Sequence, residues 1–348
     1  MKLRCIISGC VAALASQAAD AQSTITLYGR IDTGVRYSSN QDIAGGKLLE
    51  LTSGAASGSR WGVKGSEDLG GGMQAIFTLE NGFEPDTGKA AQSGRLFGRQ
   101  AWVGLSGSWG TLTAGRQYSP AYNVEFANEP FGWANVYESG FIYDNYMGGN
   151  RWDNSILYQQ KAGHFSGTLM VGFGEQAGAT RNGSKQGGSI TYELGPAAVS
   201  AGYQQTHDVN GVVDHKVWTA GGYYPIGALK LFLSYLNHRS DLTLQKNDVW
   251  ATGASYGLTP AVELYGGFYY DRQREQRGNK RTVVGMFNYK LSKRTNVYLQ
   301  ADYSKIDAGY VTNMFDVYAF PVSKDASGAI TGFVKTRASA MVGVRHQF

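Results

Sequence analysis

Cysteine is almost absent from this chain: it has two among 348 residues, Cys5 and Cys10, both within the first ten positions. Residues 11–348 therefore offer neither a disulfide framework nor a thiolate metal site. Proline is scarce as well, with 7 residues, whereas glycine (48) and tyrosine (22) are abundant. The formal net charge is only +5 and no long lysine-arginine block accompanies it, which argues against a nucleic-acid-binding protein.

Long hydrophobic runs are missing too. Two basic residues open the chain, an apolar run extends to Ala15, and an Ala-x-Ala site ends at Ala21. This order predicts a cleaved secretory signal peptide over residues 1–21, because the run is about half the length of a membrane-spanning helix. The mature chain would be one domain, residues 22–348. Losing two basic residues and one acidic residue takes its net charge from +5 to +4.

Polar and apolar residues alternate along most of the chain, as residues 24–37 and 295–302 illustrate. The apolar positions that share one parity there are Ile25, Leu27, Ile31, Val35, Tyr37, Val297, Leu299 and Ala301. Such alternation predicts β-strands with one oily and one polar face. A soluble sandwich would bury the oily face against a second sheet. A transmembrane barrel would turn it to lipid and keep the polar face for the lumen.

The number and spacing of the strands favour the barrel. About 16 segments are long enough for a tilted strand to span a bilayer. Short turns are expected at Glu67–Gly72, Gly107–Trp109, Ala162–Gly163, Gly195–Pro196, Pro225–Gly227, Leu258–Pro260 and Ser292–Lys293. Longer connections are expected at Ser38–Glu50, Asn81–Gly94, Ser119–Asn150, Glu175–Gln186, Ser240–Lys246 and Ala308–Val334. Alternation of short periplasmic turns with long outer loops is typical of outer-membrane barrels.

Aromatic residues fit the same interpretation. The pairs Tyr223-Tyr224 and Tyr269-Tyr270 fall near expected strand ends, where they would form interfacial girdles. Ordinary β-propensity is the alternative explanation. The chain ends on an alternating strand with a terminal aromatic, Phe348.

Several motifs, in this order, resemble those of the Gram-negative general porins of the beta-proteobacterial and neisserial type. They are Thr26–Asp32, Ser57–Gly70, Phe77–Phe83, Leu96–Leu105, Gly110–Arg116, Arg151–Tyr158, Tyr289–Thr295 and Val344–Phe348. The resemblance covers the whole mature chain. It implies an all-β, 16-stranded antiparallel transmembrane β-barrel that forms homotrimers in the outer membrane. It also implies that the third outer loop folds into the lumen, and that Phe348 belongs to a signal read by the barrel-insertion machinery.

Charge placement suggests a pore constriction. The loop 119–150 carries acids but no lysine or arginine, and its acids are Glu125, Glu129, Glu138 and Asp144. The barrel wall offers basic residues, namely Arg30, Arg60, Lys64, Arg99, Arg116 and Arg151. If the loop folds inward, acids and bases would face each other across the pore and select solutes by size and charge. The alternative is an ordinary solvated acidic loop.

By motif position, the resemblance assigns Arg60, Arg99 and Arg151 to the basic cluster of the constriction. The position of Arg99 in the alternation disagrees with an inward direction, because Arg99 has the same parity as the apolar residues Ala101 and Val103, which are expected to face lipid. Either a bulge near Gly98 shifts the register or Gln100 is the inward residue. We expect a mild preference for anions, although the loop acids could cancel the arginines or reverse the preference.

An enzyme is not indicated. The five histidines form no H-x-x-x-H pair and none accompanies a serine-nucleophile motif, so we expect no catalytic residues, metal or cofactor. A barrel lipase or protease would need such a pair, and a secreted sugar-binding sandwich would not need sorted turns. The expected partners are further copies in a homotrimer, outer-membrane lipid and lipopolysaccharide, the insertion machinery, and small hydrophilic solutes and ions. No nucleic acid is expected.

Overall fold

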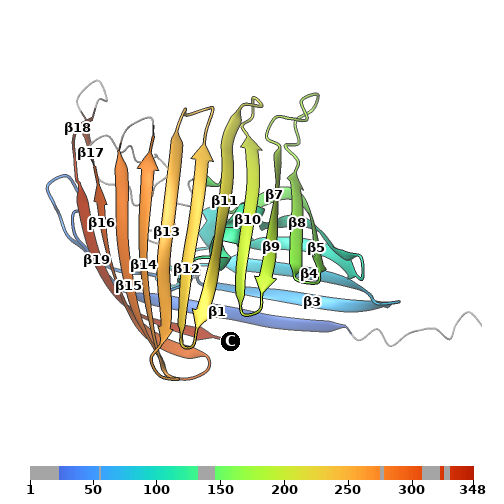
Figure 1. Cartoon of the computed structure of the whole chain (residues 1–348), viewed down its shortest axis with the longest axis horizontal. Helices are drawn as coiled ribbons and strands as arrows, with labels where there is room; N and C mark the ends of the chain where they lie inside the picture. The colour runs from blue at the N-terminus through green and yellow to red at the C-terminus, as the bar shows by residue number, and fades with distance from the viewer. Residues whose placement is uncertain (1–22, 55, 132–145, 275–277, 308–321, 325–329) are drawn as a thin grey trace, which may run out of the picture.

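The computed structural model describes residues 23–54, 56–131, 146–274, 278–307, 322–324 and 330–348. Its main feature is one continuous antiparallel sheet (Figure 1). The first strands are β1 (Thr24–Ser38), β2 (Leu48–Ser53), β3 (Arg60–Gly70), β4 (Met73–Gly82), β5 (Gln100–Gly107), β6 (Gly110–Tyr118), β7 (Arg151–Ala162) and β8 (Phe165–Gly172). The next are β9 (Lys185–Leu194), β10 (Ala197–His207), β11 (Val213–Ile226), β12 (Leu229–Arg239), β13 (Lys246–Gly257), β14 (Val262–Gln273), β15 (Asn279–Lys290), β16 (Thr295–Ile306) and β19 (Thr336–Gln347). The hairpin β17 (Val322–Lys324) and β18 (Ile330–Phe333) is separate.

The sheet closes on itself because β1 pairs with β19 on one side and with both β2 and β3 on the other. β2 and β3 are therefore two halves of one barrel strand. The segment between β2 and β3 is fixed by hydrogen bonds to the backbone of Asp32. The Asp32 N–H donates to Ser59 Oγ at 3.0 Å, and the Asp32 carbonyl accepts from the Gly54 N–H at 2.8 Å. With these two halves counted as one, the barrel has 16 antiparallel strands, as the sequence predicted.

The connections sort by length as expected. The turns β3–β4, β5–β6, β7–β8, β9–β10, β11–β12, β13–β14 and β15–β16 are all short. They lie at one end of the barrel, and the longer loops lie at the other (Figure 1). This arrangement gives the barrel a periplasmic end and an outer end.

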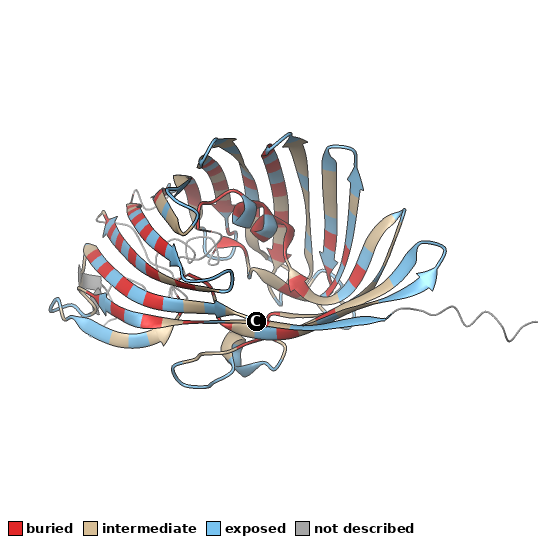
Figure 2. Cartoon of the chain, turned by 90° about the horizontal axis from the view of Figure 1, so that it is seen from below, coloured by how far each residue is buried: buried red, intermediate tan, exposed pale blue. Residues whose placement is uncertain are grey.

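The outer wall is apolar. Along β1, Ile25, Leu27 and Val35 are 71%, 62% and 51% exposed, whereas Asp32 and Arg36, which have the opposite parity, are buried on the inside. Buried and exposed residues alternate in the same way along most other strands (Figure 2). Such a wall suits lipid, where an apolar surface is not penalised by water. The barrel interpretation is thus confirmed over the sandwich.

The tyrosine pairs do not both reach the girdles, which corrects one expectation. Tyr224 is exposed on the outer wall, but Tyr269 is buried on the inside. Neighbouring strand residues point to opposite faces, so a pair can contribute only one ring to the exterior. Near the outer end the girdle rings are cross-strand pairs: Tyr203 with Trp218 at 4.3 Å and Tyr235 with Trp250 at 4.4 Å between centroids.

The described part of the loop after β6 lies inside the barrel. It contains α3 (Pro120–Ala127), whereas α2 (Ala91–Gly94) lies between β4 and β5 (Figure 2). Proline suits the first turn of α3 because the backbone N–H that it lacks would be unpaired there. Gln204, on the inner face of β10, forms hydrogen bonds to both the beginning and the end of the loop. Its side chain accepts from the Ala121 N–H at 3.0 Å and donates to the Met147 carbonyl at 2.6 Å.

Two glycines on the wall make room for the loop. A Cβ added at Gly253 would lie 2.5 Å from Pro130, and one at Gly267 would lie 2.8 Å from Phe131. A larger residue at either position would therefore push the loop off the wall. Among the described residues, no helix is both long and apolar enough to cross a bilayer.

Candidate channel constriction

The hydroxyl of Tyr118, the last residue of β6, joins two arginines. Arg99 and Arg151 donate to it at 2.8 and 2.7 Å. The Arg151 guanidinium also lies 4.4 Å from the centroid of the Tyr118 ring, a cation–π distance. The predicted residues Arg99 and Arg151 are thus brought together by a tyrosine that the sequence reasoning did not single out.

Glu80, on β4, fixes Arg99 from the other side. Arg99 Nε donates to its carboxylate at 2.7 Å and the Tyr28 hydroxyl donates to it at 3.0 Å. The Arg99 side chain is 8% exposed. A buried, hydrogen-bonded ion pair of this kind holds a guanidinium in one direction. Arg99 is therefore a fixed charge rather than a freely moving one.

Arg60 and Arg30 extend the basic group along the wall. They are direct partners in the β1–β3 ladder, although like charges in this position repel each other. Arg60 also interacts electrostatically with Arg99, and Arg30 with Arg345 of β19. We call the set Arg30, Arg60, Arg99, Arg151 and Arg345 the arginine group. Glu80 and Asp32 supply negative charge within it.

The other two predicted bases stand apart from this group. Lys64 is exposed, and its ammonium lies 5.6 Å from the Tyr28 ring centroid. Arg116 donates to the Gly98 carbonyl at 2.7 Å and to Asp153 at 2.6 Å, and Arg95 pairs with the same carboxylate at 2.8 Å. Asp153 offsets part of the charge of Arg116, so Arg116 contributes less to the field in the lumen.

The two loop acids within the described residues, Glu125 and Glu129, do not face the arginines, contrary to expectation. Glu125 is fully buried between α3 and the opposite wall, where Ser234 Oγ donates to it at 3.0 Å and the Thr219 hydroxyl also donates. Glu129 accepts from the Tyr269 hydroxyl at 2.9 Å. Glu138 and Asp144 lie outside the described residues. Positions three and four apart share a helix face, so Ala121, Glu125 and Asn128 turn together toward the wall.

Burial changes the acidity of Glu125. It raises the pKa of Glu125 to about 7, against the opposing effect of the two hydroxyl donors. The nearby Glu129 raises it further. Glu125 is therefore largely neutral in mildly acidic solution and adds little negative charge to the pore there.

Comparison with known proteins agrees with this architecture. The family model described as Gram-negative porin matches residues 9–309. The chain belongs to this family. It is 29% identical to an outer membrane porin protein of Bordetella pertussis, over 95% of this chain and 96% of that one. It is 31% identical to outer membrane porin protein 32 of Delftia acidovorans, over 96% and 97%.

Solved structures give the same result. The anion-selective porin from Comamonas acidovorans superposes with a TM-score of 0.77 at 28% identity, covering 94% of this chain and all of that one. OmpT of Vibrio cholerae superposes with a TM-score of 0.68 at 18% identity, covering 94% and 98%, which shows the shared fold alone. The porin resides in the outer membrane and forms a channel, as predicted.

The geometry of this porin also explains the parity conflict at Arg99. The β5 ladder begins one residue later, with Gln100 opposite Glu80. Arg99 precedes the strand, so the alternation of strand side chains does not set its direction. Gln100 itself points inward, because it lies opposite the inward Glu80 in the β4–β5 ladder, so the second of the two expected alternatives holds. Arg99 reaches Glu80 and Tyr118 as well, from its place before the strand.

Sequence reasoning missed the aromatic residues of the porin constriction. The Tyr118 and Tyr122 rings stack with centroids 4.7 Å apart and planes inclined by 9°, and Tyr122 stacks on Phe126 at 6.0 Å. We call these three residues the aromatic ladder. The spacing of four between Tyr122 and Phe126 was a readable signal, because residues four apart share one face of a helix. In the described part of the chain, no three acidic, histidine or cysteine residues form a metal site.

Proposed function

We propose that this porin is a passive diffusion channel for small hydrophilic solutes with a mild preference for anions, and that the arginine group sets the preference. The observation that carries the proposal is the asymmetry of the constriction. Arg99 and Arg151 converge on Tyr118, whereas Glu125 and Glu129 are turned into the opposite wall. Charges in a narrow passage with low-dielectric walls act strongly on passing ions. Glu80 offsets part of this charge, which keeps the preference mild.

The comparison with the Comamonas acidovorans porin supports this proposal, since that protein is described as anion-selective and is 28% identical. The test is the zero-current potential of the purified porin in a planar bilayer with a KCl gradient. We expect the sign that corresponds to chloride crossing more readily than potassium. A potential of the opposite sign would overturn the proposed selectivity. We propose no catalytic activity for the channel.

We further propose that residues 1–21 are removed on export, that residues 22–348 form one barrel domain, and that residues 119–150 are its constriction loop. N-terminal sequencing of the protein from outer membranes should begin at Gln22. We also propose a homotrimer, for which the trimer form of Vibrio cholerae OmpT is a structural precedent only. A single-barrel mass in mild detergent would contradict it.

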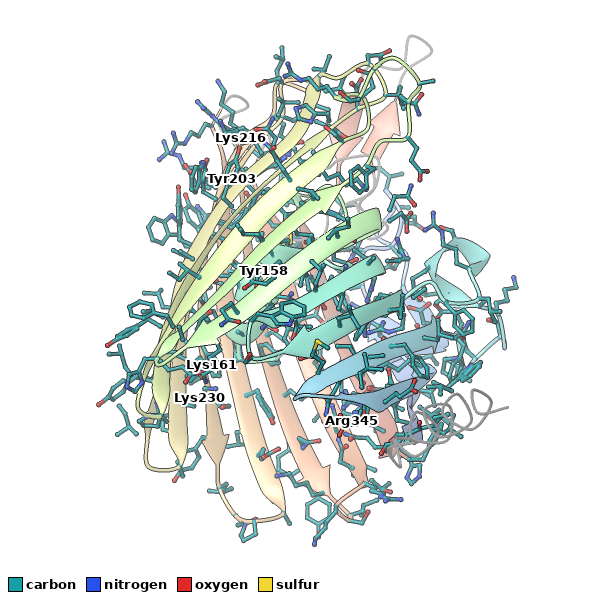
Figure 3. All side chains as sticks on the ribbon, turned by 90° about the vertical axis from the view of Figure 1, so that its right-hand side faces the viewer. Tyr158, Lys161, Tyr203, Lys216, Lys230 and Arg345 are labelled. Carbon is teal, nitrogen blue, oxygen red and sulfur yellow. The ribbon has the colours of Figure 1, made fainter. Side chains whose placement is uncertain are left out.

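Lipopolysaccharide is the proposed lipid partner, and a row of cations on the outer wall supports it. Lys216, Arg239 and Lys246 are direct cross-strand partners on β11, β12 and β13. They lie beside the girdle residues Trp218 and Trp250, and Figure 3 shows Lys216 near Tyr203 toward the loop end. Phosphates of the outer leaflet would pair with Lys216 and Arg239 and relieve the repulsion between these two neighbours. Purified Lys216→Glu/Arg239→Glu protein should retain less lipopolysaccharide, and equal retention would refute this site.

A further inference from the structure

The returning end of the loop 119–150 packs against a pair of histidines on the inner wall. His215 of β11 and His238 of β12 lie on neighbouring strands (Figure 1), and Nδ1 of His215 lies 3.0 Å from Nε2 of His238. His238 is 1% exposed, and its other nitrogen, Nδ1, has no hydrogen-bond partner among the described residues. Gly148 of the loop lies directly on the pair, because a Cβ added there would be 3.0 Å from the His215 ring. The proposed function uses neither histidine.

Tyr146 is the loop residue that covers this pair. Its ring stacks on the ring of His238, with centroids 4.8 Å apart and planes inclined by 18°. Its hydroxyl donates to Asp271 of β14 at 2.5 Å and accepts from Asn247 of β13 at 2.9 Å. Asn247 is also the direct partner of His238 in the β12–β13 ladder. The end of the loop is therefore seated on one compact group of side chains, with the histidine pair beneath it.

The contact between the two imidazoles depends on their protonation. While at least one of the facing nitrogens carries no proton, one ring donates a hydrogen bond and the other accepts it. When both rings are protonated, two N–H donors face each other, and two positive charges lie in a largely buried site, which is unfavourable. Protons can reach the pair, since the His215 side chain is 19% exposed. Imidazoles ordinarily titrate near about pH 6.5, so acid changes the state of this contact.

Charged groups on the surrounding strands act on the pair in opposite directions. Within the described residues they are Asp214 of β11, Asp271 of β14 and Lys280 of β15. Asp214 lies 3.5 Å from His215 Nε2, and Lys280 is the direct ladder partner of Asp271. The carboxylates favour positive charge on the pair, and the ammonium of Lys280 opposes it. The side chains that β10 and β13 bring to this end of the loop, Gln204 and Asn247, are uncharged.

We propose that His215 and His238 form an acid-sensitive latch for the constriction loop. At neutral pH the uncharged pair holds the loop end under Tyr146. In acid the doubly protonated pair repels itself and releases this end into the lumen, so that the channel acquires conductance levels that it lacks at neutral pH. The inference rests on the proposed constriction loop and adds its regulation. Glu125 acts at the other end of the loop and in the opposite sense, because its protonation strengthens the attachment of α3.

Single-channel recording of the purified porin at about pH 7.5 and about pH 4.5 tests the latch, because these values lie on either side of the imidazole range. We expect a steady current at the higher pH and transitions between levels at the lower pH. His238→Phe keeps a ring against Tyr146 but takes up no proton, so its current should stay steady at both. His215→Gln, which leaves only one imidazole, should do the same. His164→Gln is the matched control, because His164 is exposed in the turn between β7 and β8, and it should behave as the wild type.

A cysteine introduced at Met147 shows whether the loop itself moves. Residues 11–348 contain no cysteine, so the thiol is unique there, and Met147 is 0% exposed. Its rate of modification by a water-soluble methanethiosulfonate is divided by the rate at Asp86→Cys, an exposed loop position, at the same pH. On acidification this ratio should rise by about 10-fold or more, because repulsion between two adjacent charges exceeds the equivalent free energy. It should stay constant when His238→Phe is combined with Met147→Cys.

Three results would overturn the latch: a steady wild-type current at both pH values, equal acid-induced transitions in His238→Phe, or a constant modification ratio at Met147→Cys. Each of them leaves the anion preference measured at neutral pH standing. A cation preference in KCl at neutral pH would instead refute the proposed function, and it is measured without reference to the histidines.

Discussion

Glu125 shows how one side chain couples the constriction loop to the wall. Its carboxyl group is fully buried and has two hydroxyl donors, Thr219 and Ser234. Burial favours the neutral form of a carboxyl group, and this effect outweighs the hydrogen bonds that favour the charged form. Protonation of this group therefore strengthens the attachment of α3 to β11 and β12.

The sign of the pH dependence follows from this shift. The pKa of Glu125 rises from the usual 4.5 to about 7 on folding, so its contribution is fully present below about pH 4.5. The contribution is lost as the pH rises through about 7. Between pH 5 and 8 we expect a loss of stability on the order of 3 kcal/mol at most. Glu125→Gln should flatten this part of the profile.

Thermal unfolding in detergent, followed by tryptophan fluorescence at several pH values, measures this difference. Asp86→Asn, which changes an exposed loop acid, serves as the control and should behave as the wild type. Parallel profiles for the wild type and Glu125→Gln would show that Glu125 does not control loop attachment.

Among the elements, β1 and β19 form the closure of the barrel. Phe348 follows β19 directly, and its backbone exchanges two hydrogen bonds with Gly29, at 3.0 and 3.1 Å. Its ring covers Gly29 so closely that a Cβ added there would lie 2.2 Å from the ring. The terminal aromatic thus contributes to the closing seam in addition to its proposed role as an assembly signal.

Deleting Phe348 should lower the assembled fraction several-fold without lowering synthesis, because the seam loses two hydrogen bonds and the covering ring. Gly29→Ala should impair assembly as well, since it displaces the ring while keeping the terminal residue. Gly285→Ala is the matched control, because a Cβ there meets its nearest neighbour at 3.9 Å. Heat-modifiable migration in detergent gels measures the folded fraction. Normal assembly of both test variants would contradict a role for this seam.

The strands could be predicted from the sequence because each carries its own signal, the alternation of oily and polar residues. Tertiary features carry no such local signal. The break between β2 and β3 depends on Asp32, which is more than twenty residues away in the sequence. The direction of the Glu125 side chain depends on which face of α3 packs against the wall. For the same reason, Arg99 could be placed by motif but its ion pair with Glu80 could not.

At the scale of the whole molecule, selectivity depends on where charge lies in the lumen rather than on how much there is. The net charge of +5 is small, and charges more than about 10 Å from a passing ion are screened in 0.1 M salt. The arginine group lies on the side of the barrel formed by β19 and β1–β7. The described loop acids are buried against the β10–β14 side. This separation leaves the basic wall to govern which ions pass.

The most direct test is the zero-current potential of the Arg60→Ser/Arg151→Ser double variant in a KCl gradient. We expect it to shift toward cations relative to the wild type, because two half-buried cations leave the constriction. Arg116→Ser is the matched control and should shift the potential less, since Asp153 already offsets part of the charge of Arg116. A zero-current potential equal to that of the wild type in the double variant would contradict the central claim that these arginines set the selectivity.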